Sequence, residues 1–131
     1  MTPKFRAYDG GSLNRMYQPD EVMVGNGDIW IIDEDSVAGE WIVNNDIHLM
    51  QSTGFGDEFD KELFEGDVIL WTYWDEFEDS GRAKIIFDKG MFRLLDIRTE
   101  KEVWDNLFDC IENCNVFLQG NIYENKELLD A

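Results

Sequence analysis

Short apolar runs separated by polar turns dominate the first half of the chain. Apolar and polar residues alternate over residues 4–8, and brief runs of β-branched and aromatic residues recur up to Met50. Clusters of Gly, Asn, Asp and Ser lie between them, and these residue types favour turns. The pattern predicts an N-terminal hairpin over residues 4–18, followed by short strands over residues 22–24, 29–32, 41–43 and 47–50.

The longest apolar and aromatic run lies in the middle of the chain, over residues 63–74. It follows a loop that we expect over residues 54–62. We expect a central strand from Glu65 to about Trp74, ended by an acidic turn over residues 75–81. Two further strands, separated by short turns, are expected over residues 82–88 and 91–97, which is typical of an antiparallel meander.

The apolar pattern changes its period after residue 100. Five apolar residues recur there at a helix-like spacing: Val103, Trp104, Leu107, Phe108 and Ile111. A short helix is therefore expected over residues 101–112, with a strand as the alternative. A last strand is expected over residues 116–123, and Asn125 is placed to cap a final helical turn. The whole pattern predicts a mainly β fold, a small SH3-like barrel or meander with an N-terminal hairpin lobe and one or two short helices.

Length and charge narrow the possible functions. With 131 residues, of which 44% are hydrophobic, the chain can form a single domain with one core, and sub-lobes over residues 1–53 and 54–131 are the alternative division. Eleven basic and 29 acidic residues give a net charge of −18. Such a surface repels phosphate backbones, so direct DNA or RNA binding is disfavoured. The charge indicates either simple solubility or a surface that imitates nucleic acid.

Membrane, metal and cofactor chemistry receive little support from the sequence. The chain has neither an apolar run near 20 residues nor an apolar N-terminal segment, so we expect a cytoplasmic protein without membrane contact. Cys110 and Cys114 are expected to be reduced thiols. Two cysteines are too few for a zinc site, and His48 is distant in sequence. No cofactor is expected.

Three parts of the chain resemble one known family. The first part reads K-F-R-A-Y-D over residues 4–9. The middle part reads L-M-Q-S-T-G over residues 49–54, followed by E-G-D-V over residues 65–68. The last part reads G-N-I-Y-E-N-K-E-L-L over residues 120–129. In this order they resemble the YopX family of phage and prophage proteins. The resemblance implies a mostly β fold with a small barrel, frequent self-association and no assigned activity. The family pattern has a glycine where this chain has Asp60, so the turn there is expected to differ.

The sequence Glu65-Gly66-Asp67 invites two interpretations. Two carboxylates on either side of a glycine could serve catalysis, and a hydrolase using Glu65, Asp67 and His48 is the weakest of our alternatives. The same pattern is common where a strand enters a small barrel, because the glycine permits a bend and the aspartate accepts backbone hydrogen bonds. We therefore interpret six residues as structural: Glu65, Gly66, Asp67, Gly120, Asn121 and Tyr123.

Acidic and aromatic clusters provide the remaining candidates. Asp57, Glu58 and Asp60 lack the spacing of a calcium loop, and we interpret them as solvated. Alternation along the central strand puts Trp71 and Tyr73 on one face and Trp74 on the other. One of these faces is expected in the core, and the other would mark an interface if it were exposed.

We therefore expect a non-enzymatic accessory protein of the bacterial cytoplasm that acts through protein contacts and forms a homo-oligomer. The interface candidates are Trp71, Tyr73, Trp74, Asp75, Glu76, Glu78 and Asp79. The alternative is an acidic mimic of nucleic acid that inhibits a DNA- or RNA-binding protein of the host or of a defence system. Its acidic surface would include residues 33–35, 57–60 and 75–79.

Overall fold

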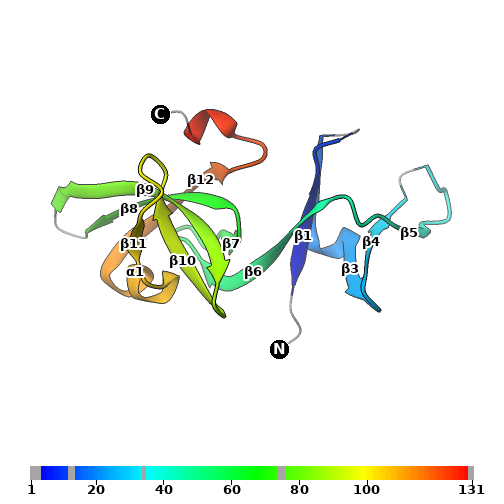
Figure 1. The fold of residues 1–131 in the computed structure, drawn as a ribbon, viewed down its shortest axis with the longest axis horizontal. Coiled ribbons are helices and arrows are strands. Elements are labelled where there is room, and N and C mark those ends of the chain that lie inside the picture. Colours follow the sequence, from blue (N-terminus) through cyan, green and yellow to red (C-terminus); the bar gives the residue numbers. More distant parts are fainter. Residues whose placement is uncertain (1–3, 12–13, 34, 74–75, 130–131) are drawn as a thin grey trace. The chain divides into compact units, whose positions relative to one another are not determined.

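The computed structural model describes residues 4–11, 14–33, 35–73 and 76–129, with side chains of the last range from Ser80 on (Figure 1). The chain divides into two compact units, Met1–Ser52 and Thr53–Ala131. Each unit has its own buried apolar cluster. Strands make up most of both units, so the predicted mainly β fold is confirmed.

The first unit begins with the predicted hairpin. β1 (Phe5–Asp9) pairs antiparallel with β2 (Arg15–Tyr17), and its other edge pairs with β6 (His48–Gly56). In this second ladder Phe5 lies opposite Gln51. Two of the segments that carry the family resemblance are therefore hydrogen-bonded partners in one sheet.

A three-stranded antiparallel sheet completes this unit. A short 3-10 turn, Pro19–Glu21, leads into β3 (Val22–Gly25), which is followed by β4 (Asp28–Ile32) and β5 (Trp41–Val43) in the order β3-β4-β5. All three strands lie where the apolar runs predicted them. Their inner faces and the hairpin form a core of Ala7, Tyr17, Val22, Ile31 and Ile47.

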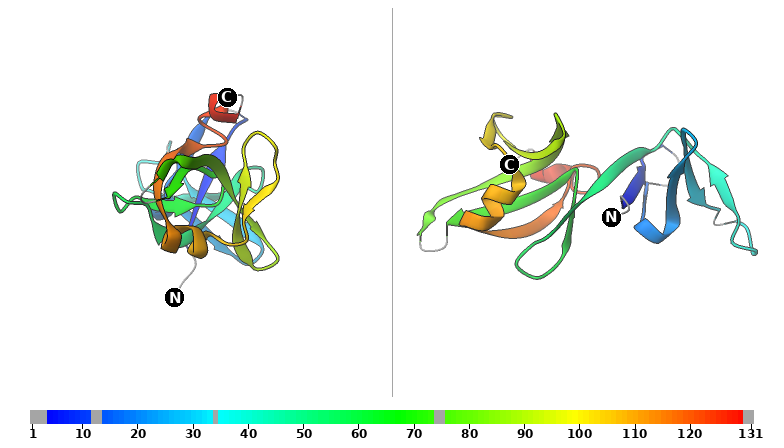
Figure 2. Two further views of the ribbon diagram at one scale, coloured as in Figure 1. Left: turned by 90° about the vertical axis from the view of Figure 1, so that its left-hand side faces the viewer. Right: turned by 90° about the horizontal axis from the view of Figure 1, so that it is seen from below.

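The second unit is a curled five-stranded antiparallel sheet with one helix, which together form a half-barrel. The elements of this unit after β6 are β7 (Glu62–Phe64), β8 (Asp67–Tyr73), β9 (Glu76–Asp88), β10 (Met91–Asp96), β11 (Glu102–Trp104), α1 (Leu107–Asn113), β12 (Cys114–Asn121) and the 3-10 turn η2 (Lys126–Leu129). The sheet order is β11-β10-β9-β8-β12, so the predicted meander is confirmed. Helix α1 packs against β10, β11 and β12, and it is the coiled orange ribbon in the right-hand view of Figure 2.

Two boundaries near the middle of the chain differ from the prediction. The loop expected over residues 54–62 is shorter, because β6 continues to Gly56 and β7 begins at Glu62. The hydroxyl of Thr53 donates a hydrogen bond to the carbonyl oxygen of Leu63 (2.8 Å), which joins these two strands. The central strand begins at Asp67 instead of Glu65, because Gly66 turns the chain with a φ of 90°.

Two further predictions fail where pairing overrides local polarity. The prediction of an acidic turn over residues 75–81 is wrong, because β9 begins at Glu76. This strand pairs with β8, and in the ladder Gly81 lies opposite Trp71. The helix over residues 101–112 is partly wrong, because the first half forms β11, the strand alternative. The helix begins later, where the side chain of Asn106 accepts the backbone N–H of Asp109 (2.8 Å) and caps it.

Among the residues described, no helix is long and apolar enough to cross a lipid bilayer.

Candidate functional site

The turn at Glu65-Gly66-Asp67 is a structural junction between β7 and β8. Asp67 is 1% exposed, and its Oδ2 accepts the backbone N–H of Phe64 at 2.7 Å. The N–H of Gly66 donates to the carbonyl oxygen of Ile85 on β9 (2.8 Å). The hydrolase alternative requires Asp67 to be exposed in a pocket, and its burial within the hydrogen bonds of this turn argues against that role.

The turn that follows β12 lies against this junction. The N–H of Ile122 donates to the carbonyl oxygen of Gly66 (2.9 Å), which brings the middle and C-terminal family segments together. Asn121 is buried, and its Oδ1 accepts the N–H groups of Tyr123 (3.0 Å) and Glu124 (2.8 Å). Burial, aided by the negative charge of Glu65, raises the pKa of Tyr123. These contacts agree with a structural role for both turns.

Gly120 and Asn125 occupy neighbouring positions in the same turn. The Oδ1 of Asn125 accepts the N–H of Asn121 (3.1 Å) instead of capping the final helical turn. A Cβ atom at residue 120 would lie 2.5 Å from this Oδ1. The close approach explains why a glycine stands there.

Asp57 corrects the interpretation of its loop as solvated. The side chain is 9% exposed, and it accepts three backbone N–H groups. Oδ1 binds those of Phe59 and Lys61, both at 2.9 Å, and Oδ2 binds that of Leu118 at 2.9 Å. Burial alone would raise the pKa of Asp57, but these donors and the charge of Lys61 lower it below its usual value.

The other acidic residues of this loop fit the prediction. Glu58 and Asp60 are exposed. Asp60 adopts a φ of 63°, a conformation that aspartate tolerates better than most residues. The chain therefore makes a positive-φ turn where the family pattern has a glycine.

The aromatic residues of β8 form a cluster with Trp104, which the sequence pattern had assigned to a helix. The rings of Trp71 and Tyr73 lie 5.8 Å apart, and Trp104 on β11 lies 5.9 Å from Trp71. Trp71 and Trp104 pack against the core of the second unit, while Tyr73 is 39% exposed. The face shared by Trp71 and Tyr73 is thus the core side of the sheet, and Tyr73 lies at the solvent-exposed margin of that core.

The remaining interface candidates cannot be placed. Trp74 and Asp75 lie outside the described residues. Glu76, Glu78 and Asp79 belong to β9, but their side chains also lie outside the description. Their role at an interface stays a prediction.

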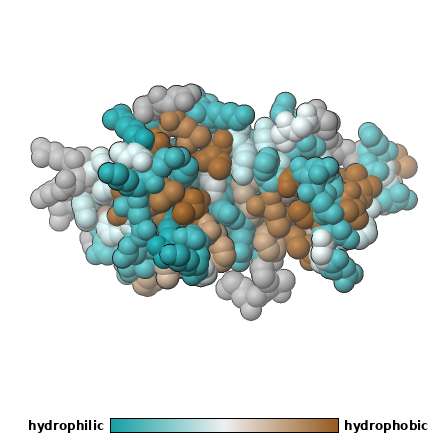
Figure 3. Space-filling view, viewed as in Figure 1, coloured by the Kyte–Doolittle hydropathy of each residue, from teal (hydrophilic) through white to brown (hydrophobic). Residues whose placement is uncertain are grey.

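An apolar surface on β3, β4 and β5 was missed by the sequence analysis. Met23, Trp30 and Val43 lie side by side across the three strands, on the face opposite Ile31. Met23 is 49% exposed and Val43 is 44% exposed. Apolar residues gather over this sheet in Figure 3. We call Met23, Trp30 and Val43 the apolar rung.

Sequence alone held one signal for this surface. Asp28 is the single charged residue within the three strands, although the chain carries a net charge of −18. Patterning identified the strands correctly, but it could not tell which of two apolar faces the core would cover.

The cysteines and possible metal ligands form no site that the structure supports. Cys110 and Cys114 are free, buried thiols, and burial raises the pKa of each. Within the described residues there is no group of three His, Cys, Asp or Glu side chains that could hold a metal ion. His48 is an exposed residue of the first unit.

Comparison with known proteins decides the family. The YopX protein family model matches residues 4–130. This chain belongs to the YopX family. The crystal structure of yopX from Bacillus subtilis is similar, with 20% sequence identity, a TM-score of 0.67 and coverage of 100% of this chain and 98% of that one.

A second solved structure in the comparison has the same fold. The crystal structure of EF1440 from Enterococcus faecalis matches with 24% identity and a TM-score of 0.63, covering 98% of this chain and 99% of that one. No curated protein matches the chain. Membership of the YopX family therefore establishes the fold without assigning an activity.

Proposed function

We propose that this chain is a non-enzymatic phage accessory protein that acts through protein contacts and self-associates through the β3-β4-β5 sheet. The apolar rung is the observation that carries the proposal. Met23 and Val43 expose large apolar side chains on strands whose single charged residue is Asp28. Soluble monomers rarely leave such side chains contiguous and uncovered, and contiguous patches mark interfaces.

A second copy of the chain is the occupant that this surface fits best. β3 and β5 are the outer strands of their sheet, so each has an edge on which a further strand can pair. An apolar face with few charges is also self-complementary, as a two-fold interface requires.

The distribution of charge confines a nucleic-acid mimic to surfaces outside residues 82–101. Six of the eleven basic residues lie within residues 82–101: Arg82, Lys84, Lys89, Arg93, Arg98 and Lys101. A surface that imitates a nucleic acid should be uniformly acidic where it meets its partner. The mimic hypothesis also predicts binding that weakens with salt, which separates it from an apolar contact.

Sedimentation equilibrium over a wide range of protein concentration tests the proposal. We expect a mass above 15.3 kDa that rises with concentration and with salt, because salt screens the repulsion between copies of net charge −18. The double variant M23S/V43S should lower the association constant by at least about tenfold, since each buried apolar side chain contributes on the order of 1–2 kcal/mol.

The control is the double variant F87S/M91S, which removes two similarly exposed side chains (43% and 39%) from the second unit. It should associate like the original chain. A monomer at every concentration would overturn the proposal, and so would an equal loss of association in both double variants. Circular dichroism should show that each variant is folded.

A further inference from the structure

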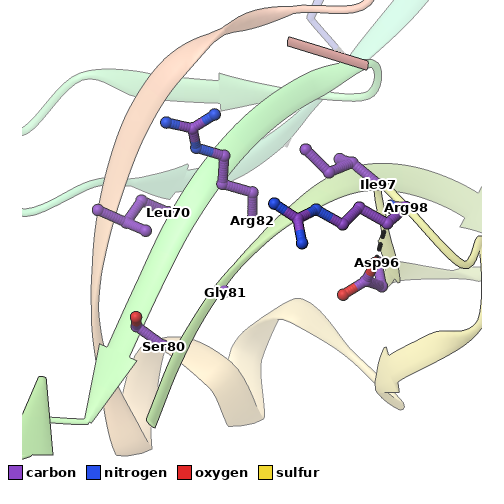
Figure 4. Close-up of a pocket in the computed structure, with 7 residues that line it drawn as sticks. All are labelled: Leu70, Ser80, Gly81, Arg82, Asp96, Ile97 and Arg98. Atoms are coloured by element: carbon purple, nitrogen blue, oxygen red, sulfur yellow. Dashed lines mark hydrogen bonds between the residues drawn. The ribbon is translucent and has the colours of Figure 1, made fainter. Parts of the chain in front are cut away.

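A pocket of about 390 Å³ in the second unit brings charges of both signs together (Figure 4). The Oδ1 of Asp96 accepts the N–H groups of Arg98 (2.8 Å) and Thr99 (3.1 Å), so this carboxylate belongs to the turn after β10. Arg82 on β9 lines the same pocket. Because Asp96 offsets part of the arginine charge, the pocket favours no one sign of ligand charge, and the clearer binding feature lies in the first unit. The lining residues of the pocket are Leu70, Ser80, Gly81, Arg82, Asp96, Ile97 and Arg98.

The outer strand β5 of the first unit exposes apolar side chains on both faces of its sheet. Ile42 is 43% exposed and Val43 is 44% exposed. Ile42 lies opposite Ile31 of β4, on the core face, whereas Val43 lies opposite Trp30, in the apolar rung. A partner packed flat against the rung would cover Val43 and leave Ile42 in water. A strand added beside β5 would cover both side chains at once.

The backbone of β5 is open along the same edge. The N–H of Asn44, directly after β5, donates to the carbonyl oxygen of Ile29 on β4 (2.9 Å). In an antiparallel ladder, residues that bond one neighbouring strand alternate with residues that bond the other. The N–H and C=O groups of Trp41 and Val43 therefore point away from β4, toward the side on which β5 ends its sheet (Figure 1).

The other outer strand, β3, offers a poorer edge. It packs beside β1 within the same unit, and its first residue, Val22, is buried in the core. The sequence of β5, Trp41–Val43, contains neither the lysine nor the proline with which many proteins keep an exposed edge strand from pairing. A new strand is therefore expected to join the sheet at β5.

We propose that β5 pairs with β5 of a second copy in an antiparallel, two-fold arrangement centred on Ile42, an inference that rests on the self-association proposed above. In this register Trp41 lies opposite Val43 of the second copy, and these outward-facing residues exchange N–H···O bonds. Ile42 meets its own counterpart on the two-fold axis, so the contact is self-complementary. Two sheets of three strands each thereby join as one continuous sheet.

Charge supports this register over its neighbours. Centring on Ile42 places Glu40 opposite Asn44 of the second copy, so a carboxylate faces a neutral amide. If the centre moved one residue toward the C-terminus, Glu40 would face Asp46, and like charges in opposed positions destabilise a ladder. If it moved one residue the other way, Glu40 would lie against the apolar side chain of Ile42.

Hydrogen exchange of the backbone amides tests the pairing directly. The concentration of the original chain is raised through the range in which sedimentation shows association. Exchange at Trp41 and Val43 should then slow by about tenfold or more, because their N–H groups become bonded. Exchange at Ile42 should change much less, since its N–H already faces β4. Association without slower exchange at Trp41 and Val43 would overturn the pairing of β5 while leaving self-association itself in place.

Complementary charges at residue 42 test the register. The variants I42K and I42E each put two like charges on the axis, so each alone should associate at least about tenfold more weakly than the original chain. An equimolar mixture should recover association to within about threefold, because lysine then faces glutamate. Circular dichroism should show that both variants are folded. A mixture that associates as weakly as either variant alone would overturn the register.

The variant M23S separates edge pairing from a contact through the sheet face. Met23 lies on β3, on the far side of β4 from the new ladder, so M23S should weaken association less than V43S does. Equal weakening by M23S and V43S, with no effect of I42K, would assign the contact to the face and overturn the pairing of β5. A monomer at every concentration would instead overturn the self-association on which this inference rests.

Discussion

The carboxylate of Asp57 and the backbone N–H of Leu118 meet at 2.9 Å although 61 residues separate them. The other oxygen of the same carboxylate accepts two N–H groups of its own loop. One buried side chain thus closes the β6–β7 loop and fixes that loop to β12. Such a group is expected to contribute more to stability than a solvent-exposed acid. If the carboxylate were removed, its backbone N–H partners would be left without an acceptor.

The variant D57N should be less stable than the original chain by about 1–3 kcal/mol. Asparagine keeps one acceptor oxygen, but its amide nitrogen would face an N–H donor where Asp57 presents its second oxygen. Urea unfolding monitored by circular dichroism measures the difference. D60N is the matched control, since Asp60 is exposed and Asn tolerates its φ of 63°. A D57N midpoint equal to that of D60N would contradict the prediction.

Acid should selectively remove the contribution of Asp57. Its folded pKa lies below the ordinary value of 3.8, so the unfolded chain binds the proton more readily. The stabilisation is therefore present above the ordinary value and is lost as the pH falls through the lowered folded value. The difference in stability between the original chain and D57N should shrink over this window, as measured by unfolding at a series of pH values. A difference that stays constant would argue against the assignment.

The variant G120A should destabilise the C-terminal turn. The new Cβ would lie 2.5 Å from the Oδ1 of Asn125, so this side chain would have to leave the N–H of Asn121. We expect a loss of about 1–3 kcal/mol, as for other overpacked sites. The control G25A adds a Cβ with no described atom within 4 Å. Thermal unfolding of both variants checks the prediction, which fails if they are equally stable.

The variant G81A should disturb the aromatic cluster of the second unit. A Cβ at residue 81 would lie 3.1 Å from Cζ2 of Trp71, and a rigid indole can only shift as a whole. Because Trp71 contacts Tyr73 and Trp104, the near-ultraviolet circular dichroism of these rings should change. An unchanged aromatic spectrum would show that the sheet adjusts instead.

Local patterning predicted the strands whose faces differ in polarity. The alternation over residues 82–88 and 91–97 gave β10 and the second half of β9, because one face of each strand is buried. The pattern failed over residues 76–81, where the chain is acidic yet extended by pairing with β8. A ladder partner is a property of the fold, and no window of neighbouring residues contains it.

The candidate sites were harder to predict for the same reason. Burial of Asp57 depends on Leu118, and the exposed loop around it gave no sign of this contact. The pocket joins Arg82 to Arg98 through a turn whose conformation the sequence did not indicate. The clustering of basic residues over residues 82–101 was the available signal, and the net charge of the whole chain conceals it.

The thiols of Cys110 and Cys114 should be inert in the folded chain. Both are buried, and burial raises the pKa of each, so little thiolate forms near neutral pH. A thiol reagent should react with neither cysteine until denaturant is added, and then with both. Rapid reaction of the folded chain would contradict this.

Protected thiols make the protein convenient for spectroscopy. A cysteine introduced at an exposed position such as Gln119 would be the reactive thiol of the folded molecule, so a dye or spin label would attach there selectively. No native cysteine would have to be removed, and the core around Cys110 would stay intact. Energy transfer between singly labelled copies could then report assembly in dilute solution, where changes in mass are hard to detect.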